Sequence, residues 1–202
     1  GAVTVKLNLP PWVVITHLAN AMVLLATLLI LALRTSPHFR PALPAAARHP
    51  AHGLVHLTAL LGFVVILFGA QVANFNAGLL CLGFPLCNGS IAPPASSLAM
   101  LHWTHRLLAF AFVALAIVLA VRLRGRRAMT GGRALARAGL AVAALAVLQV
   151  IVAATMVLHL LPPGLRALHL LVGTAVWVSL VVLAFVSARA GTVAEGTAAA
   201  GA

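Results

Sequence analysis

Acidic residues are almost absent from this 202-residue chain, in which Glu195 is the only carboxylate side chain against 13 Lys and Arg. Catalysis by a pair of carboxylates is therefore excluded within the chain. Charged residues are also scarce, at 7% of the sequence compared with roughly 25% in a soluble domain. A net charge of +12 can indicate nucleic-acid binding, but no folded basic domain fits between the apolar segments, so we expect no nucleic-acid partner.

Long apolar segments dominate what is present, since 63% of the residues are hydrophobic. A helix needs about 20 apolar residues to cross the core of a bilayer. Five windows meet this requirement, at 11–33, 53–75, 99–121, 139–160 and 167–188. The sequence therefore predicts an all-α membrane protein with five transmembrane helices.

The positive charges predict the orientation of these helices, because Lys and Arg are retained on the cytoplasmic side of a membrane. Ten of the thirteen lie in the connections 34–52 and 122–138 or directly after the last helix, at Arg189. The connection 76–98 carries no charge, so we place it on the outer side of a bacterial cytoplasmic membrane. Residues 189–202 contain nothing to bury, and we expect a disordered tail there.

An internal repeat appears when the sequence is shifted by 152 positions, which aligns Leu9-Pro10-Pro11 and His17 with Leu161-Pro162-Pro163 and His169. Proline in the first turn marks a helix start, so both helices should begin at the outer surface with a histidine about 9 Å below it. We interpret residues 1–33 as the last helix of an incomplete amino-terminal four-helix unit. Residues 34–52 are then a cytoplasmic linker, and residues 53–188 form a complete carboxyl-terminal unit. Because the chain begins with Gly, we expect it to be a fragment of a longer protein.

Two histidines stand at similar depth in different predicted helices. His105 is six residues into the third window and His169 is six residues beyond Pro163. Two imidazoles at one level can bind a haem iron from both faces. The alternative is that both histidines bond to backbone carbonyls.

An arginine accompanies each of these histidines. Arg106 follows His105 directly, and Arg166 precedes His169 by one helical turn. An arginine inside a membrane span needs a partner, and the membrane part of the chain contains no acidic residue. Haem propionates would supply the missing anions, so we predict that both arginines bind the cofactor. The alternative is that they extend to lipid phosphates.

The remaining polar residues of the helices receive simpler interpretations. His102 lies one turn before His105, as either an alternative ligand or a pocket group. His17, the repeat partner of His169, is predicted to be a ligand in the incomplete first unit. We expect Gln149 to form a hydrogen bond between helices. Solvated, interfacial or helix-end roles are expected for the other histidines, which are His38, His49, His52, His56 and His159.

The only cysteines, Cys81 and Cys87, lie in the connection placed on the outer side. An oxidising compartment permits a disulfide there. The sequence leaves open whether the pair is a structural staple or a thiol pair that cycles. A zinc site is not expected, because the loop offers only two thiolates.

Together these motifs resemble the carboxyl-terminal half of the haem A synthase family, over residues 1 to about 188. The matching residues are Gln71, Asn76-Ala77-Gly78, Cys81, Phe84-Pro85-Leu86-Cys87-Asn88-Gly89, His105-Arg106-Leu107-Leu108-Ala109, Leu161-Pro162-Pro163 and His169. Members of the family have two similar four-helix halves and oxidise a ring methyl of haem O to the formyl of haem A.

The resemblance implies that His105 and His169 ligate a haem b cofactor, and that His17 ligates the substrate haem O. It also implies a membrane electron donor, with haem O synthase as a candidate partner. The substrate site of the family uses a Glu, but the position one turn before His105 is His102. We therefore assign this bundle to the cofactor half and expect the catalytic residues in absent amino-terminal helices.

Two other functions remain open at this point. A bis-histidine haem b subunit that only transfers electrons would share the haem ligands and lack a substrate pocket. A haem-free assembly or transport protein would be colourless when purified.

Overall fold

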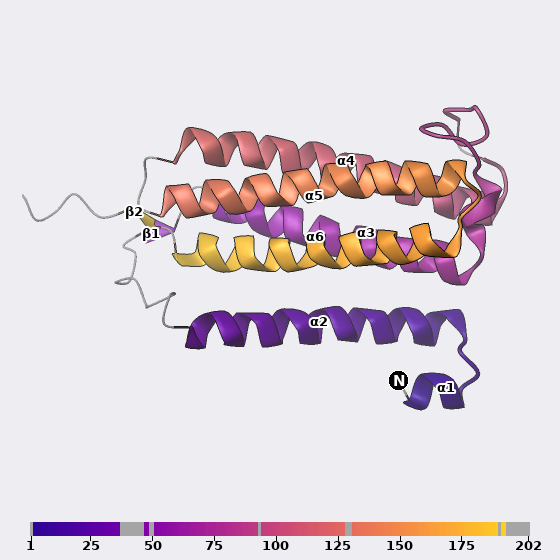
Figure 1. Cartoon of the computed structure of the whole chain (residues 1–202), viewed down its shortest axis with the longest axis horizontal. Coiled ribbons are helices and arrows are strands. Elements are labelled where there is room, and N and C mark those ends of the chain that lie inside the picture. The colour runs from indigo at the N-terminus through magenta and orange to yellow at the C-terminus, as the bar shows by residue number, and fades with distance from the viewer. Residues whose placement is uncertain are drawn as a thin grey trace, which may run out of the picture.

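A computed structural model describes residues 2–36, 47–48, 51–92, 94–127, 131–189 and 191–192. Within these residues, five helices are long and apolar enough to cross a membrane (Figure 1). They are α2 (Pro11–Thr35), α3 (His52–Asn74), α4 (Ser97–Gly125), α5 (Gly132–Leu158) and α6 (Pro163–Arg189). The predicted all-α membrane fold is thereby confirmed.

Short elements flank these helices at both ends. Helix α1 (Ala2–Lys6) precedes α2, and the 3-10 helix η2 (Ala77–Leu80) follows α3. The two-residue strands β1 (Ala47–Arg48) and β2 (Gly191–Thr192) pair antiparallel. The pairing brings the segment after α2 to the segment after α6. The other residues of the predicted linker and tail, including His38 and His49, lie outside the described residues.

Four of the long helices form a closed bundle. Helix α3 packs against α4, α4 against α5, α5 against α6, and α6 returns to α3, so α4 and α6 are diagonal to each other. Helix α2 lies outside this bundle and contacts α3 and α6 (Figure 1). We call the end that carries η2 the loop end, and the opposite end, where α4 ends and α5 begins, the arginine end.

The hydrophobic core occupies the half of the bundle nearest the arginine end. It combines the start of α3, the second half of α4, the first half of α5 and the second half of α6. Its members are Ala51, Val55, Phe112, Ala116, Leu119, Leu123, Leu135, Val142, Ala146, Val176, Leu180 and Leu183. Hydrophobic side chains, mostly aliphatic, therefore pack the four helices together in this half.

Several helices extend beyond the predicted windows at the arginine end. Helix α4 continues to Gly125 and α5 begins at Gly132, so both contain arginines that the charge pattern assigned to a connection. The side chains of Arg122, Arg124, Arg133 and Arg137 are exposed. A helix satisfies its own backbone hydrogen bonds and can therefore continue past the apolar segment with solvated side chains.

The two halves of the sequence repeat adopt the same local geometry. Asn8 and Leu9 have φ of 58° and 55°, and Leu160 and Leu161 have φ of 59° and 62°. All four residues therefore have a left-handed backbone conformation, which residues other than glycine rarely adopt. Helices α2 and α6 then begin at the equivalent prolines, Pro11 and Pro163. The repeat thus includes a specific turn as well as a shared motif.

Candidate haem site at the loop end

His105 and His169 lie on the diagonal helices α4 and α6, which face each other across the bundle. Among the residues that the structure describes, the buried Nδ1 atoms of both rings have no hydrogen-bond partner. Two imidazoles from opposite sides of a bundle fit a bis-histidine haem iron.

A glycine of α3 leaves room for the His105 ring. A Cβ atom built at Gly69 would lie 3.0 Å from Cε1 and 3.5 Å from Nε2 of His105. Because 3.0 Å is closer than ordinary van der Waals contact between carbons, any larger residue at this position would press on the imidazole. Gly69 is therefore part of the site.

Gln149 of α5 meets His169 of α6. Its side-chain Nε2 lies 2.9 Å from the carbonyl oxygen of His169 and 3.3 Å from the imidazole Nε2 of the same residue. The expected hydrogen bond between helices is thereby confirmed, and its partner is one of the two predicted haem ligands.

Arg106 is buried, with 7% of its surface exposed, and its guanidinium points into the cysteine loop. Nη1 donates to the carbonyls of Gly83 (2.9 Å) and Leu86 (3.0 Å), and Nη2 donates to the carbonyl of Cys81. Nε donates to Nε2 of His102 at 3.2 Å. Four of the five guanidinium N–H groups therefore have partners within the protein. The burial is inconsistent with the alternative in which Arg106 extends to lipid phosphate.

His102 is the residue whose role the sequence left open. An arginine can only donate hydrogen bonds, so Nε2 of His102 accepts the bond from Arg106. That nitrogen therefore has no free lone pair for a metal. The structure favours a pocket role for His102, in which it orients Arg106 from one turn away.

Cys81 and Cys87 form a disulfide, and both are buried. Asn88 connects the two sides of the closed loop. Its backbone N–H donates to the Leu82 carbonyl at 2.8 Å, its Oδ1 accepts from the Leu82 N–H at 2.8 Å, and its Nδ2 donates to the Leu80 carbonyl at 3.1 Å. Together with Arg106, these bonds fix the loop over the end of the bundle that holds the histidines.

Three other residues that the sequence singled out lie near the surface. Arg166 is exposed on the first turn of α6. His17 is exposed on α2. Its place in α2 is equivalent to that of His169 in α6. His159 follows the last residue of α5, and its Nδ1 lies 2.8 Å from the Thr155 carbonyl, as expected for a helix-end residue.

Two histidines at the arginine end interact with each other. The ring centroids of His52 and His56 are 4.2 Å apart. Nδ1 of His52 lies 3.3 Å from Oγ of the buried Ser187. His52 was expected to be solvated, but it connects α3 to α6. Serine at the end of a helix gave no sequence signal for this contact.

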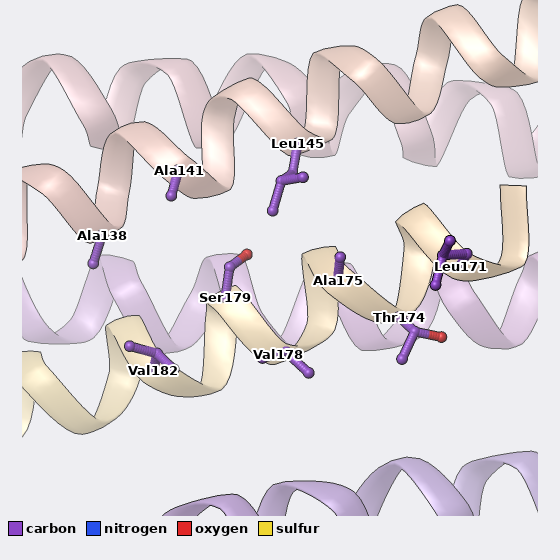
Figure 2. Close-up of a pocket in the computed structure, with 9 residues that line it drawn as sticks. All are labelled: Ala138, Ala141, Leu145, Leu171, Thr174, Ala175, Val178, Ser179 and Val182. Atoms are coloured by element: carbon purple, nitrogen blue, oxygen red, sulfur yellow. The ribbon is translucent and has the colours of Figure 1, made fainter. Parts of the chain in front are cut away.

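A groove of about 540 Å³ opens between α5 and α6, and the residues that line it include no histidine (Figure 2). Only two of its lining residues carry polar side-chain atoms, Thr174 and Ser179. Both hydroxyls donate to carbonyls of their own helix, at 2.9 and 2.8 Å. The groove is therefore apolar and separate from the candidate haem site. The remaining lining residues are Ala138, Ala141, Leu145, Leu171, Ala175, Val178 and Val182.

Sequence reasoning missed Gly69, and it named Asn88 only as part of the motif that carries the resemblance, without its hydrogen bonds to Leu80 and Leu82. A glycine inside an apolar helix has no signature that distinguishes a close contact from a neutral position. The pair Asn88-Gly89 does carry a turn signal, because Asn and Gly tolerate positive φ more readily than other residues. In the structure their φ angles are 51° and 79°.

Comparisons with known proteins identify the family of the chain. A family model described as cytochrome oxidase assembly protein matches residues 1–181. The protein named Heme A synthase from Methylorubrum extorquens (strain PA1) is 33% identical over 148 residues, which cover 66% of this chain and 37% of that protein. The Heme A synthase of Methylobacterium sp. (strain 4-46) is 36% identical over 154 residues, covering 66% and 40%. No solved structure matches the chain.

The chain spans less than half the length of these relatives. The family model nevertheless covers most of the chain and all five membrane helices up to residue 181. The chain is therefore a multi-pass membrane protein that belongs to the cytochrome oxidase assembly protein family.

Proposed function

We propose that this chain provides the haem b unit of a haem A synthase, in which His105 and His169 would hold the haem iron. The observation that carries the proposal is the opposed pair of imidazoles on α4 and α6, each with a buried Nδ1 that has no partner among the described residues. The names of the relatives support the assignment to haem A biosynthesis.

The residues around this pair fit a haem. When bound between two imidazoles, haem supplies one-electron transfer and has no open position for a strongly bound ligand. His105 and His169 would hold the iron, and Gly69 keeps the His105 ring unobstructed. Arg106 has most of its donors committed to the loop, so we propose the exposed Arg166 as the first partner of a propionate.

The finer activity is the oxidation of a ring methyl of haem O to the formyl group of haem A. In this proposal, His17 belongs to a second haem site, for the substrate, completed by residues beyond this chain. Haem O, a membrane electron donor and haem O synthase are the proposed partners. The cysteine loop lies on the outer side of the bacterial membrane, because the arginines gather at the opposite end.

Replacement of the ligands tests the haem assignment. We expect His105→Ala and His169→Ala each to abolish the absorption spectrum of bound haem in the purified chain. His159→Ala removes a histidine near the same end and should leave the spectrum unchanged. Pyridine extraction identifies the bound haem, with haem b expected. Full haem retention by both ligand variants would overturn the assignment.

A second experiment separates the enzyme from an electron-transfer subunit. Deletion of the gene should remove haem A from the membranes and lead to accumulation of haem O. The intact gene should restore haem A, whereas the His169→Ala allele should not. An unchanged ratio of haem A to haem O after deletion would contradict the proposed reaction and favour a role in electron transfer alone.

A further inference from the structure

The contact between Gln149 and His169 indicates which imidazole nitrogen of His169 carries the proton. The carboxamide of Gln149 reaches from α5 to α6, and Nε2 lies 2.9 Å from the His169 carbonyl and 3.3 Å from the imidazole Nε2. Gly173, also on α6, makes room for it, since a Cβ there would lie 3.1 Å from Nε2 of Gln149.

The orientation of this carboxamide follows from its partners. A carbonyl oxygen can only accept a hydrogen bond, so the amide group of Gln149 that faces the His169 carbonyl must be its NH2. The flipped orientation would place two acceptor oxygens 2.9 Å apart. The same NH2 therefore also faces the imidazole, where it can only act as a donor.

The imidazole nitrogen that faces Gln149 must then accept. A neutral histidine has one protonated and one unprotonated ring nitrogen, so this contact selects the tautomer with its lone pair on Nε2 and its proton on Nδ1. Nδ1 of His169 has no partner among the described residues. Within the described part of the chain, Gln149 is thus the side chain whose contact decides between the two tautomers of His169.

We propose that Gln149 is a positioning residue that holds His169 in the tautomer able to bind haem iron through Nε2. This inference rests on the proposed function, because it assigns the lone pair to that ligand. Gln149 can release Nε2 to the iron and remain anchored to His169 by its second N–H on the carbonyl oxygen. Iron ligation by an imidazole requires the unprotonated nitrogen that Gln149 keeps available.

The pair formed by Arg106 and His102 provides a contrast. There Nε2 of the histidine is also an acceptor, but its donor is a buried cation held by three loop carbonyls. Arg106 could not move away from Nε2 of His102 without losing its hydrogen bonds to the loop carbonyls. His102 and His169 thus have their lone pairs on the same nitrogen, yet only His169 can exchange its partner for a metal.

Nitrogen NMR of the haem-free full chain tests the proposal directly. The protein is produced with 15N-labelled histidine, and the signals of His169 are identified by their loss in His169→Ala. We expect Nε2 to show the shift of an unprotonated ring nitrogen and Nδ1 that of a protonated one. The opposite assignment in the wild-type protein would overturn the proposal, and this measurement requires no variant of Gln149 to fold.

The variant Gln149→Leu then tests whether Gln149 is the cause. One hydrogen bond contributes about 0.5–1.5 kcal/mol, so its loss should change the ratio of the two tautomers by roughly 3- to 10-fold toward protonation of Nε2. Thr155→Val is the matched control, because its hydroxyl bonds only to Ile151 of the same helix. An unchanged ratio in Gln149→Leu would overturn the positioning role.

Failure of the two proposals can be told apart. The tautomer is read in haem-free protein, whereas the ligand role of His169 is read from the haem spectrum of His169→Ala. Haem retention in that variant would overturn both the ligand assignment and the purpose proposed for Gln149. Haem loss combined with a protonated Nε2 in the wild-type protein would overturn only the inference about Gln149.

Discussion

Arg106 shows how a single charged residue can be accommodated inside a membrane helix without an acidic partner. Burying an unpaired charge is costly, but carbonyl oxygens can replace the water that a guanidinium loses. Three carbonyls of the cysteine loop and one imidazole do so here. Arg106 therefore connects the loop to the helix of His105, at the position next to that histidine.

Replacement of Arg106 by lysine should destabilise the protein although the charge is kept. A lysine has one nitrogen and cannot reach partners placed around a planar guanidinium. At least one buried acceptor is left without a donor, which costs about 2–3 kcal/mol of unfolding free energy. Unfolding titrations in mixed micelles measure this loss. Arg124→Lys, at an exposed site on the same helix, should change stability by less than about 0.5 kcal/mol. Equal stability of the two variants would contradict the role of the loop contacts.

Gly69→Ala and Gly53→Ala should change stability in opposite directions. Both glycines lie in α3, where alanine favours the helix by up to about 1 kcal/mol. A Cβ at Gly53 meets nothing within 4 Å, whereas at Gly69 it lies 3.0 Å from His105. We expect Gly53→Ala to stabilise and Gly69→Ala to destabilise by about 1–2 kcal/mol. Gly69→Ala should also shift the haem spectrum, and a stabilised Gly69→Ala with an unchanged spectrum would contradict the contact.

Individual site residues differed in how far the sequence could predict them. His105, His169 and Arg106 stand out because a polar group inside an apolar segment must have a partner. The partners themselves could not be predicted, since those of Arg106 are backbone carbonyls about twenty residues away, which carry no residue-specific signal. Propionate binding by Arg106 and Arg166 stays a prediction.

At the level of helices and loops, hydrophobicity predicted all five membrane helices, and proline marked two of their starts. The ends were less predictable. A transmembrane window measures the apolar segment, whereas α4 and α5 continue through exposed arginines that form the same backbone hydrogen bonds. The paired left-handed residues before Pro10 and Pro162 were also beyond prediction, because leucine rarely adopts that conformation.

Trp177 of α6 holds α2 against the bundle, and a substitution at Trp177 can test this attachment. Its indole Nε1 donates to the Met22 carbonyl at 2.9 Å, and its ring lies 5.3 Å from that of Phe63 on α3. Trp177→Phe removes this hydrogen bond between helices, worth about 1 kcal/mol. We expect amide hydrogen exchange in α2 to rise about fivefold, while exchange in α4 and α5 is unchanged. Trp12→Phe, at an exposed position of α2, should leave exchange as in the wild type. Uniform acceleration in all helices would argue against a specific attachment.

For the molecule as a whole, most of the described arginines lie at the end of the bundle opposite the disulfide, which yields a test of its orientation. We expect a membrane-impermeant reductant followed by an impermeant maleimide to label Cys81 and Cys87 in intact spheroplasts. The comparison is Arg127→Cys with both native cysteines replaced by serine. That thiol should react only after the membrane is permeabilised. The reverse pattern would invert the proposed topology and place the histidine pair near the cytoplasm.

The division of the bundle into two unlike halves has a consequence for biogenesis. The continuous aliphatic core lies toward the arginine end, whereas all four buried polar atoms without partners in the described residues belong to His102, His105, Gln149 and His169 near the loop end. The polypeptide can therefore be inserted and assembled from its aliphatic half before any cofactor arrives. Under the proposed function, haem would complete only the other half, so we expect a shortage of haem to leave an intact apoprotein in the bilayer rather than a substrate for proteolysis.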